Sequence, residues 1–160
     1  MDRALIDLYL AGGGRLTGAI EGLSAAELNA LPVPGTWSIR QIIIHLLDSD
    51  LIASHRMKRI IAEDTPLLIG YDETRFAQQL FYEQMDAALV CRLFADNRAM
   101  TAAILTRLPD EAFARWGVHN QYGKLTLAQM IRSYVDHLPH HLKIVHQKRR
   151  LLGKPAARED

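Results

Sequence analysis

The sequence predicts an all-α fold in which four main helices form a bundle and short extra helices connect them. Apolar residues recur at helical spacing along almost the whole chain, and no stretch alternates with period two for long enough to indicate a strand. Three capping-box patterns, which mark helix N-termini, begin at Ser24, Ser38 and Thr126. The 160 residues fit a single domain, placed at 1–152, with a polar tail at 153–160 that is expected to be disordered.

The first main helix is predicted over residues 2–23, and the run Gly12–Gly14 interrupts it. Each glycine costs about 1 kcal/mol relative to alanine inside a helix, so the run indicates either a kink or a close packing contact. A phosphate-binding loop is not indicated, because no predicted strand precedes the glycines. The capping box at Ser24 predicts a short helix that ends near Leu31, before a stretch rich in proline and glycine.

The second main helix is predicted from Ser38 to about Glu63, with isoleucine and leucine side chains along its apolar face. Residues 64–72 contain Pro66 and Gly70, and we expect them to form a loop. A broken helical stretch follows this loop and leads into the second half of the chain.

The C-terminal half contains the other two main helices. The third is predicted over residues 84–108 and ends at Pro109, after which Asp110 can cap a short helix. Residues 118–124 are mostly polar and contain a glycine, which indicates a loop. The last helix is predicted over residues 126–152 and begins with the third capping box.

Composition and charge argue against several classes of protein. The formal net charge is +1 and basic residues do not dominate the chain, so nucleic acid is not expected as the main partner. No run of about 18 apolar residues predicts a membrane span, and the N-terminus lacks the apolar segment of a secretory signal. Cys91 is the single cysteine, so it cannot form an internal disulfide, and its apolar neighbours predict an inert core thiol. A cytoplasmic protein in a reducing compartment is the expectation.

The spacing of three histidines points to a metal site. His137 and His141 are four residues apart in the last predicted helix, which stacks two imidazoles on one face. His45 lies among isoleucines and leucines in the second helix, so its ring faces the interior and needs a partner. Two interpretations remain open: the three bind one metal ion, or they are core histidines that are simply hydrogen-bonded. The other histidines are expected at the surface or rim without a ligand role: His55, His119, His140 and His146.

A site of three neutral imidazoles suits zinc, nickel, copper or iron(II). Three protein ligands leave a coordination position for water or substrate, which is typical of a catalytic site, and the metal lowers the pKa of bound water towards neutrality. Asp48 lies one turn after His45 and is a candidate catalytic residue that orients or deprotonates the nucleophile. The alternative for Asp48 is an aspartate on the helix surface.

Several other residues near these positions have open roles. Pro139 lies between His137 and His141, where it is either a tolerated bend or the feature that aims the two rings. Tyr71 and Asp72 lie in the predicted loop and could form the edge of a pocket. The remaining candidates are expected to be structural: Trp37 and Trp116 as packing residues, and Lys148–Arg150 as cations favoured at a helix C-terminus.

Two motifs carry a resemblance to a known family. Gly35-Thr36-Trp37-Ser38-Ile39-Arg40-Gln41 is followed by His45-Leu46, and the chain later reads Tyr134-Val135-Asp136-His137-Leu138-Pro139-His140-His141. Together with Tyr71-Asp72-Glu73, these motifs resemble the DinB-like superfamily, and within it the YfiT-type metal-dependent hydrolases. That branch also includes bacillithiol S-transferases. The resemblance runs from about Pro32 to Leu152, which is most of the chain.

The resemblance implies a four-helix bundle, often a homodimer, that binds nickel or zinc on three histidines. The match carries the ligand role onto His45, which follows the Trp-Ser-Ile-Arg motif at the family spacing, and onto His137 and His141 in the last helix. The branch often reads Asp-Ser-His where this chain has Asp48-Ser49-Asp50. This departure leaves the three ligands in place and bears on the surroundings of the substrate.

The expected function is therefore that of a metal-dependent enzyme acting on a small-molecule substrate. The metal would activate either water, for hydrolysis, or a low-molecular-weight thiol cosubstrate, for transfer to an electrophilic carbon. One alternative is a non-catalytic, stress-associated, metal-binding helical dimer, and another is a helical bundle that binds no metal. Turnover that is lost on His141→Ala while the fold survives would distinguish the enzyme from both alternatives.

Overall fold

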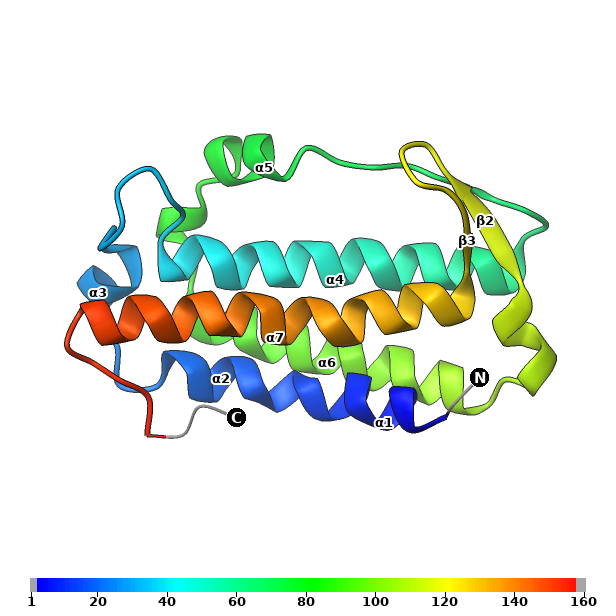
Figure 1. Cartoon of the computed structure of the whole chain (residues 1–160), viewed down its shortest axis with the longest axis horizontal. Coiled ribbons are helices and arrows are strands. Elements are labelled where there is room, and N and C mark those ends of the chain that lie inside the picture. The colour runs from blue at the N-terminus through cyan, green and yellow to red at the C-terminus, as the bar shows by residue number, and fades with distance from the viewer. Residues whose placement is uncertain (1–2, 158–160) are drawn as a thin grey trace.

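The computed structural model describes residues 3–157, which form a bundle of four long helical units (Figure 1). A short 3₁₀ turn divides the first unit, and the other three are continuous. The four units are α1 (Ala4–Ala11) with α2 (Arg15–Ile20), α4 (Ile39–Ala62), α6 (Ala87–Thr106) and α7 (Leu127–Leu151). The shorter elements are α3 (Ala25–Asn29), α5 (Glu73–Gln79) and 3₁₀ turns at Tyr82–Gln84 and Asp110–Ala114. The predicted four-helix bundle with short extra helices is confirmed.

Helices α4 and α7 lie side by side and run in opposite directions, as the colours along the chain show (Figure 1). Helix α4 also packs on α6, and α1 packs on both α6 and α7, which closes the bundle. Because α4 and α6 run in the same direction, a tight turn cannot join them. The connecting segment instead runs back along the bundle and carries α5 over α4 (Figure 1).

All three predicted capping boxes form. Ser24, Ser38 and Thr126 each accept a hydrogen bond from the backbone N–H three residues further on, and the side chain at that position accepts one in return. Helix α6 begins at Ala87 rather than at residue 84. The reason is Asp86, whose carboxylate accepts hydrogen bonds from two backbone N–H groups and serves as the N-cap.

The glycine run of the first helix is a close packing contact against α6. A Cβ on Gly12 would lie 2.4 Å from Nη1 of Arg98, and a Cβ on Gly13 would lie 3.2 Å from Cα of Ala95. The 3₁₀ turn at Gly12–Gly14 therefore lets the backbone approach α6 more closely than any residue with a side chain would. Of the two interpretations left open by the sequence, the packing contact is the one observed.

A buried polar network crosses the middle of the bundle. Arg98 on α6 forms an ion pair with Asp50 on α4, with Nη2 3.0 Å from Oδ1, and both side chains are 1% exposed. The Tyr9 hydroxyl and the Asn97 amide donate to the other carboxylate oxygen of Asp50. Arg98 also donates to the backbone carbonyls of Tyr9 and Tyr134. The network therefore joins α1, α4, α6 and α7 and meets the hydrogen-bonding needs of the buried charges.

Two apolar clusters pack on either side of this polar layer. Along α4, one cluster includes residues 39–47 and the other includes Ala53, Met57 and Ile60. Asp50 lies between these two groups along α4. Arg98 likewise lies between Phe94 of the first cluster and Ala102 of the second along α6. Burial of these apolar side chains supplies the main driving force for folding.

Three short strands form a sheet, so the expectation that the chain contains no strand is wrong. The strands are β1 (Leu67–Leu68), β2 (Trp116–His119) and β3 (Gly123–Thr126), in the order β1-β2-β3. They occupy parts of both predicted loops, 64–72 and 118–124. Strands of two to four residues are too short to show an alternating pattern, and β1 depends on parallel pairing with β2, far along the chain.

The basic run at the end of α7 is more deeply packed than a helix-dipole interaction requires. Lys148 and Arg149 are buried: the Lys148 amine donates to the Thr36 hydroxyl, and Arg149 donates to the carbonyls of Ala19 and Glu21. These contacts tie the end of α7 to the end of the first helical unit and to the turn before α4.

The chain after α7 folds back on Arg149, which donates to the carbonyl of Lys154. Residue 2 of the predicted first helix and residues 158–160 of the predicted tail lie outside the described residues, and the disorder of the tail stays a prediction. Within residues 3–157, no helix combines the length and the apolar character that a membrane span needs.

Candidate metal centre

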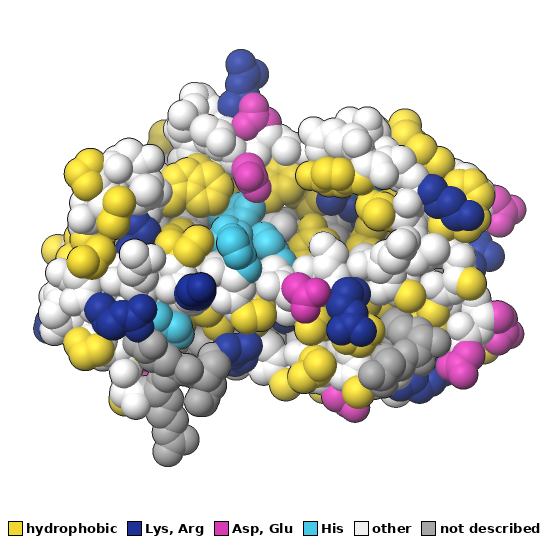
Figure 2. All heavy atoms as spheres, viewed as in Figure 1, with side chains coloured by type: hydrophobic (Ala, Val, Ile, Leu, Met, Phe, Trp, Pro, Cys, Tyr) yellow, Lys and Arg dark blue, Asp and Glu magenta, His cyan; other side chains and the backbone are white. Residues whose placement is uncertain are grey.

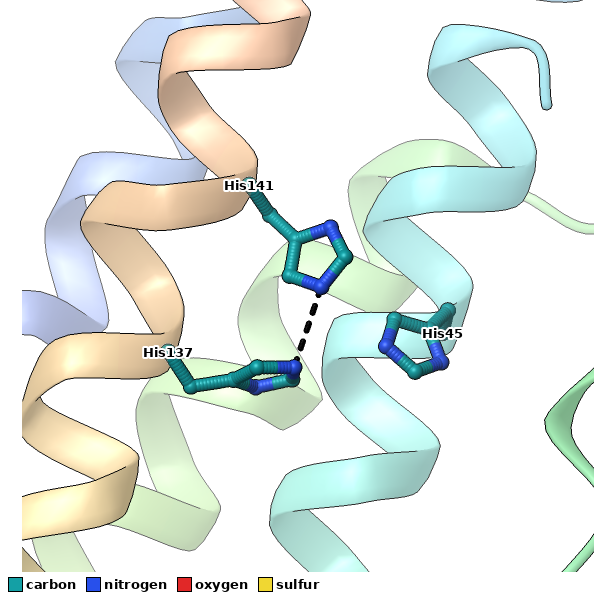
Figure 3. Close-up of side chains that lie close together, drawn as sticks. All are labelled: His45, His137 and His141. Carbon is teal, nitrogen blue, oxygen red and sulfur yellow. Dashed lines mark hydrogen bonds between the residues drawn. The ribbon is translucent and has the colours of Figure 1, made fainter. Parts of the chain in front are cut away.

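The structure brings together the three histidines that the sequence selected. His45 projects from α4, and His137 and His141 project from α7 towards it (Figure 3). One ring nitrogen from each lies within 4.8 Å of the others, and the Nε2 atoms of His137 and His141 are 3.0 Å apart. The three rings come from two adjacent antiparallel helices, so the bundle itself holds them in place.

Local helix geometry accounts for the pair on α7. The helix continues from Leu127 to Leu151 with Pro139 inside it, so residues 137 and 141 share one face. Proline lacks an N–H, which leaves the carbonyl four residues earlier without its helical donor. Arg98 donates to the neighbouring carbonyl of Tyr134 and supports this stretch of backbone.

Burial makes all three imidazoles neutral at physiological pH. His45 is 2% exposed, and burial lowers its pKa below the usual value. Burial, together with the neighbouring histidines, lowers the pKa of His137 to about 3 and that of His141 to about 4. A neutral imidazole keeps a lone pair on one nitrogen, which is the form that binds a metal ion.

A carboxylate lies behind His45, away from the other two rings. Nδ1 of His45 is 3.6 Å from Oε2 of Glu73 and 3.5 Å from the Tyr71 hydroxyl. A carboxylate at this distance favours the proton on Nδ1 and so leaves the Nε2 lone pair free for a metal, as in many histidine metal sites. The sequence places Glu73 in the motif Tyr71-Asp72-Glu73 but gives it no role, because it lies 28 residues after His45 and only the return of the chain over α4 brings it near.

The donor set fits a divalent transition metal. Two nitrogens on one tetrahedral zinc ion are about 3.3 Å apart, from bond lengths of about 2.0–2.1 Å. This is close to the 3.0 Å between the Nε2 atoms of His137 and His141. Within the described residues, the cluster contains three histidines and no thiolate or carboxylate. A three-nitrogen set leaves at least one coordination position open, which distinguishes it from the closed four-ligand sites that stabilise folds.

Asp48 lies near the histidines but has another partner. Its carboxylate accepts a hydrogen bond from the Tyr82 hydroxyl, and it is half-buried rather than on the open surface of α4. Asp48 is close enough to His45 to favour the charged form of that ring. Burial and this hydrogen bond raise the pKa of Tyr82, so the tyrosine keeps its proton and holds the carboxylate.

A cavity of about 420 Å³ adjoins the histidines. Figure 2 shows histidine side chains in a hollow at the centre of the face formed by α4 and α7, with acidic side chains directly above them. The cavity is bounded by α4, α7, the segment before α5 and the β2–β3 hairpin. Its lining residues are Ser49, Arg56, Gly70, Tyr71, Asp72, Glu73, His119, Gln121, Tyr122, Ser133, Tyr134 and His137. Tyr71 and Asp72 thus lie at a pocket, as the sequence suggested.

Two of the four histidines expected at the surface or rim are buried, so that expectation is wrong for them. His119 is 4% exposed and His146 is 8% exposed. His119 lies in β2 of the unpredicted sheet, and His146 lies on the inner face of α7. Neither residue belongs to the three-histidine cluster.

The aromatic and thiol candidates have mainly packing roles. The Trp37 ring lies 5.0 Å from that of His45 and packs against the apolar core. Trp116 is covered by the Lys124 amine, 4.5 Å from its ring centre. Cys91 is buried, and burial raises the pKa of its thiol to about 11, which suits the predicted inert core thiol.

Comparison with known proteins places this geometry in context. The model of the DinB superfamily matches residues 9–145. The chain is 27% identical over 140 residues to the Bacillus subtilis protein named "Putative metal-dependent hydrolase YfiT", covering 87% of this chain and 79% of that one. It is 30% identical over 136 residues to a Bacillus licheniformis protein also named as a metal-dependent hydrolase, covering 81% and 77%.

Solved structures agree on the fold. The structure of YfiT from Bacillus subtilis, which is described as a four-helix bundle of unusual topology, matches with a TM-score of 0.88 and 26% identity. That match covers 94% of this chain and 86% of the other. A mycothiol-dependent maleylpyruvate isomerase matches with a TM-score of 0.68 at 13% identity, over 88% of this chain and 58% of that one. The second likeness shows a shared fold alone.

Proposed function

The chain belongs to the DinB superfamily, and on that premise we propose that it is a metal-dependent enzyme that binds one divalent ion on His45, His137 and His141. The observation that carries the proposal is the convergence of three neutral ring nitrogens within 4.8 Å beside a cavity large enough for a small molecule. Similar proteins are named as metal-dependent hydrolases, and this supports the proposal.

The reaction we propose is hydrolysis of a small-molecule substrate. A divalent transition metal supplies Lewis acidity, which lowers the pKa of a water or thiol that it binds. Glu73 lies 3.6 Å from Nδ1 of His45, where its charge would favour a proton on that nitrogen, and the cavity would orient the substrate. Transfer of a low-molecular-weight thiol is the alternative use of the same site, because a thiol is activated by the same physics. We infer nickel or zinc as the ion and a homodimer as the assembly.

Asp48 is our candidate for the residue that accepts a proton during the reaction. It lies one turn from His45, and the Tyr82 hydroxyl donates to one of its oxygens, which leaves the other oxygen able to accept. We expect Asp48→Asn to keep the metal and to lose turnover by about 10²–10⁴-fold, the usual contribution of a general base. An Asp48→Asn protein with full activity would remove the residue from the mechanism.

Metal content tests the site directly. Elemental mass spectrometry on tag-free protein is expected to find about one divalent ion per chain, lost in His45→Ala and His137→Ala while the helical circular dichroism signal is retained. His55→Ala is the matched control, because His55 lies on α4 and is exposed. Native protein that stays metal-free after incubation with zinc or nickel would refute the proposal.

Turnover separates an enzyme from a non-catalytic metal-binding protein. Metal-loaded protein would be screened with ester and amide substrates for hydrolysis and with a thiol plus an electrophile for conjugation. Activity that is lost on His141→Ala, with the fold intact, supports an enzyme, and the substrate class that reacts decides between the two chemistries. One bound metal with no turnover in either screen favours the stress-associated, non-catalytic alternative.

A further inference from the structure

The cavity beside the histidines has a second polar end that the proposed metal chemistry does not use. Arg56 lies on α4, eleven residues after His45, and the helical rise separates their Cα atoms by about 16 Å. Arg56 and His119 line this end. They also line an adjoining cavity of about 340 Å³ that continues towards β3, so they lie where the two hollows meet.

Arg56 is a buried cation without an anionic partner. The residue is 8% exposed, and among residues 3–157 no carboxylate lies within ion-pair distance of it. Its Nη2 donates to the carbonyl of Ile69, whereas its buried Nε has no hydrogen-bond partner. An unpaired charge with a free buried donor is costly unless an anion completes it. The contrast is Arg98, whose charge Asp50 satisfies within the fold.

His119 supplies a second donor at the same place. Its Nδ1 accepts a hydrogen bond of 3.1 Å from the backbone N–H of Gln121, so the neutral ring carries its proton on Nε2. Burial and the nearby Arg56 charge both lower the pKa of His119, which keeps the ring neutral and a single donor. The Tyr122 ring lies 4.8 Å from the His119 ring and helps to fix its orientation.

Tyr134 lies close to both Arg56 and His137. The Tyr134 ring lies 5.7 Å from that of His137, and Tyr134 lines both cavities together with Arg56. Arg56 is close enough to the Tyr134 hydroxyl to oppose the rise in pKa that burial causes in this tyrosine. Arg56, Tyr134 and His137 therefore line one cavity, so a molecule held at Arg56 shares that cavity with one of the three clustered histidines.

We propose that Arg56 and His119 form an anion-binding subsite that holds a carboxylate group of the substrate, so that the substrates of this protein are small carboxylic acids. This inference rests on the proposed function in treating the bound molecule as the substrate. The guanidinium of arginine matches a carboxylate with charge-assisted hydrogen bonds, which set orientation as well as affinity.

The charges around the cavity favour a monoanion over phosphate. Among the described residues, the charged side chains that line it are Arg56, Asp72 and Glu73, besides the neutral histidines. These three carry a formal net charge of −1, which a divalent ion at the histidines would change to +1. With the ion bound, a monocarboxylate balances that charge; without it, the two acidic residues repel a phosphate dianion about twice as strongly as a monocarboxylate.

Nuclear magnetic resonance tests the subsite on the metal-free wild-type protein, in which no metal can bind the anion. The signal followed is the Nε–H cross-peak of Arg56, and the probes are hexanoate, the uncharged hexanamide and inorganic phosphate. Hexanoate is expected to shift this peak to saturation, with hexanamide and phosphate binding at least about tenfold more weakly. An unshifted peak, or equal binding of hexanamide, would overturn the subsite. Tighter binding of phosphate would overturn the carboxylate assignment.

Two substitutions of Arg56 test where hexanoate binds, so the test does not depend on the folding of a single variant. Hexanoate affinity is expected to fall at least about tenfold in Arg56→Met and in Arg56→Lys, because lysine keeps the charge but loses the Nε donor. Arg132→Met, at an exposed position on α7, is the matched control and should bind as the wild type does. Unchanged affinity in both Arg56 variants would refute the proposal, and the wild-type cross-peak remains informative if Arg56→Met does not fold.

Metal analysis of the same variants keeps the two proposals apart. Arg56→Met is expected to retain about one ion per chain, and chelated His137→Ala is expected to retain hexanoate binding. If wild-type protein binds no metal but hexanoate binding depends on Arg56, the proposed function fails and the anion subsite stands. If metal binding depends on the histidines but hexanoate binding does not depend on Arg56, the anion subsite fails and the proposed function stands.

Discussion

The chemistry of individual residues in this protein is set by what lies behind each side chain. His45 has Glu73 and Tyr71 behind its Nδ1, which directs its other nitrogen towards α7. Arg98 and Arg56 are both buried arginines, yet of the two only Arg98 has a carboxylate partner among the described residues. Residue type alone would not separate these two roles.

The metal-free protein is expected to lose stability as pH falls below neutrality. The pKa is lowered to about 3 for His137 and to about 4 for His141 in the folded protein, whereas an unfolded histidine titrates near 6.5. Between about pH 6.5 and pH 4 the unfolded chain therefore binds protons that the folded chain does not, and the free energy of unfolding declines. Urea denaturation of chelated protein at about pH 7.5 and about pH 5 measures the decline.

The histidine pair is the control for that pH dependence. A His137→Gln/His141→Gln double variant should show a shallower decline between the two pH values, because glutamine does not titrate. A double variant that loses as much stability as the wild type would show that other groups cause the effect.

Gly12→Ala is expected to destabilise the fold by about 1–3 kcal/mol, the usual range for overpacking. The new Cβ would lie 2.4 Å from Nη1 of Arg98 and 2.9 Å from a methyl carbon of Leu138. Gly14→Ala is the matched control, because no atom of another segment among residues 3–157 lies within 4 Å of its Cβ position, and it should be neutral or stabilising by up to about 1 kcal/mol. Guanidinium denaturation compares the two, and equal effects would contradict the packing explanation.

At the scale of the elements, short local signals determine where the helices begin, and long-range contacts determine how they lie. The capping boxes at Ser24, Ser38 and Thr126 form as predicted. The buried contacts of Lys148 and Arg149 with the turn before α4 and the end of α2 have no comparable local signal. The start of a helix can thus be predicted from a few adjacent residues, whereas the packing of one helix on another cannot.

Ser38→Ala is expected to cost about 1 kcal/mol of stability, because the N-cap hydrogen bond to the Gln41 N–H is lost at a buried helix start. His45 lies about two turns further along α4, so metal content should be unchanged. Ser38→Thr retains the cap oxygen and should lose less. Urea denaturation with parallel metal analysis makes the comparison, and Ser38→Ala with full stability would show that the cap is dispensable.

At the scale of the whole molecule, the polar layer and the returning segment organise the site. The Asp50–Arg98 network ties the four helical units together at mid-length, and Tyr134 joins that network through its carbonyl one turn before His137. The segment between α4 and α6 returns over the bundle and brings Glu73 to His45. The site therefore depends on all four units, although its proposed ligands come from two.

Arg98→Met is expected to destabilise the protein by about 3–5 kcal/mol, because Asp50 would remain buried without its cation. Arg75→Met is the control: its ion pair with Asp72 is exposed, and such pairs contribute at most about 1 kcal/mol. Guanidinium denaturation of both variants measures the difference. A loss for Arg98→Met no larger than for Arg75→Met would show that the layer does not hold the bundle together.

The sequence by itself determined the helical class, the three capped helix starts and the choice of His45, His137 and His141. Helical periodicity, capping and i, i+4 spacing act over one or two turns, so adjacent residues carry them. Only the tertiary structure decided the three-stranded sheet, the burial of His119, the position of Glu73 behind His45 and the unpaired charge of Arg56. Each of these depends on segments far apart in the chain, whose contacts form only when the bundle packs.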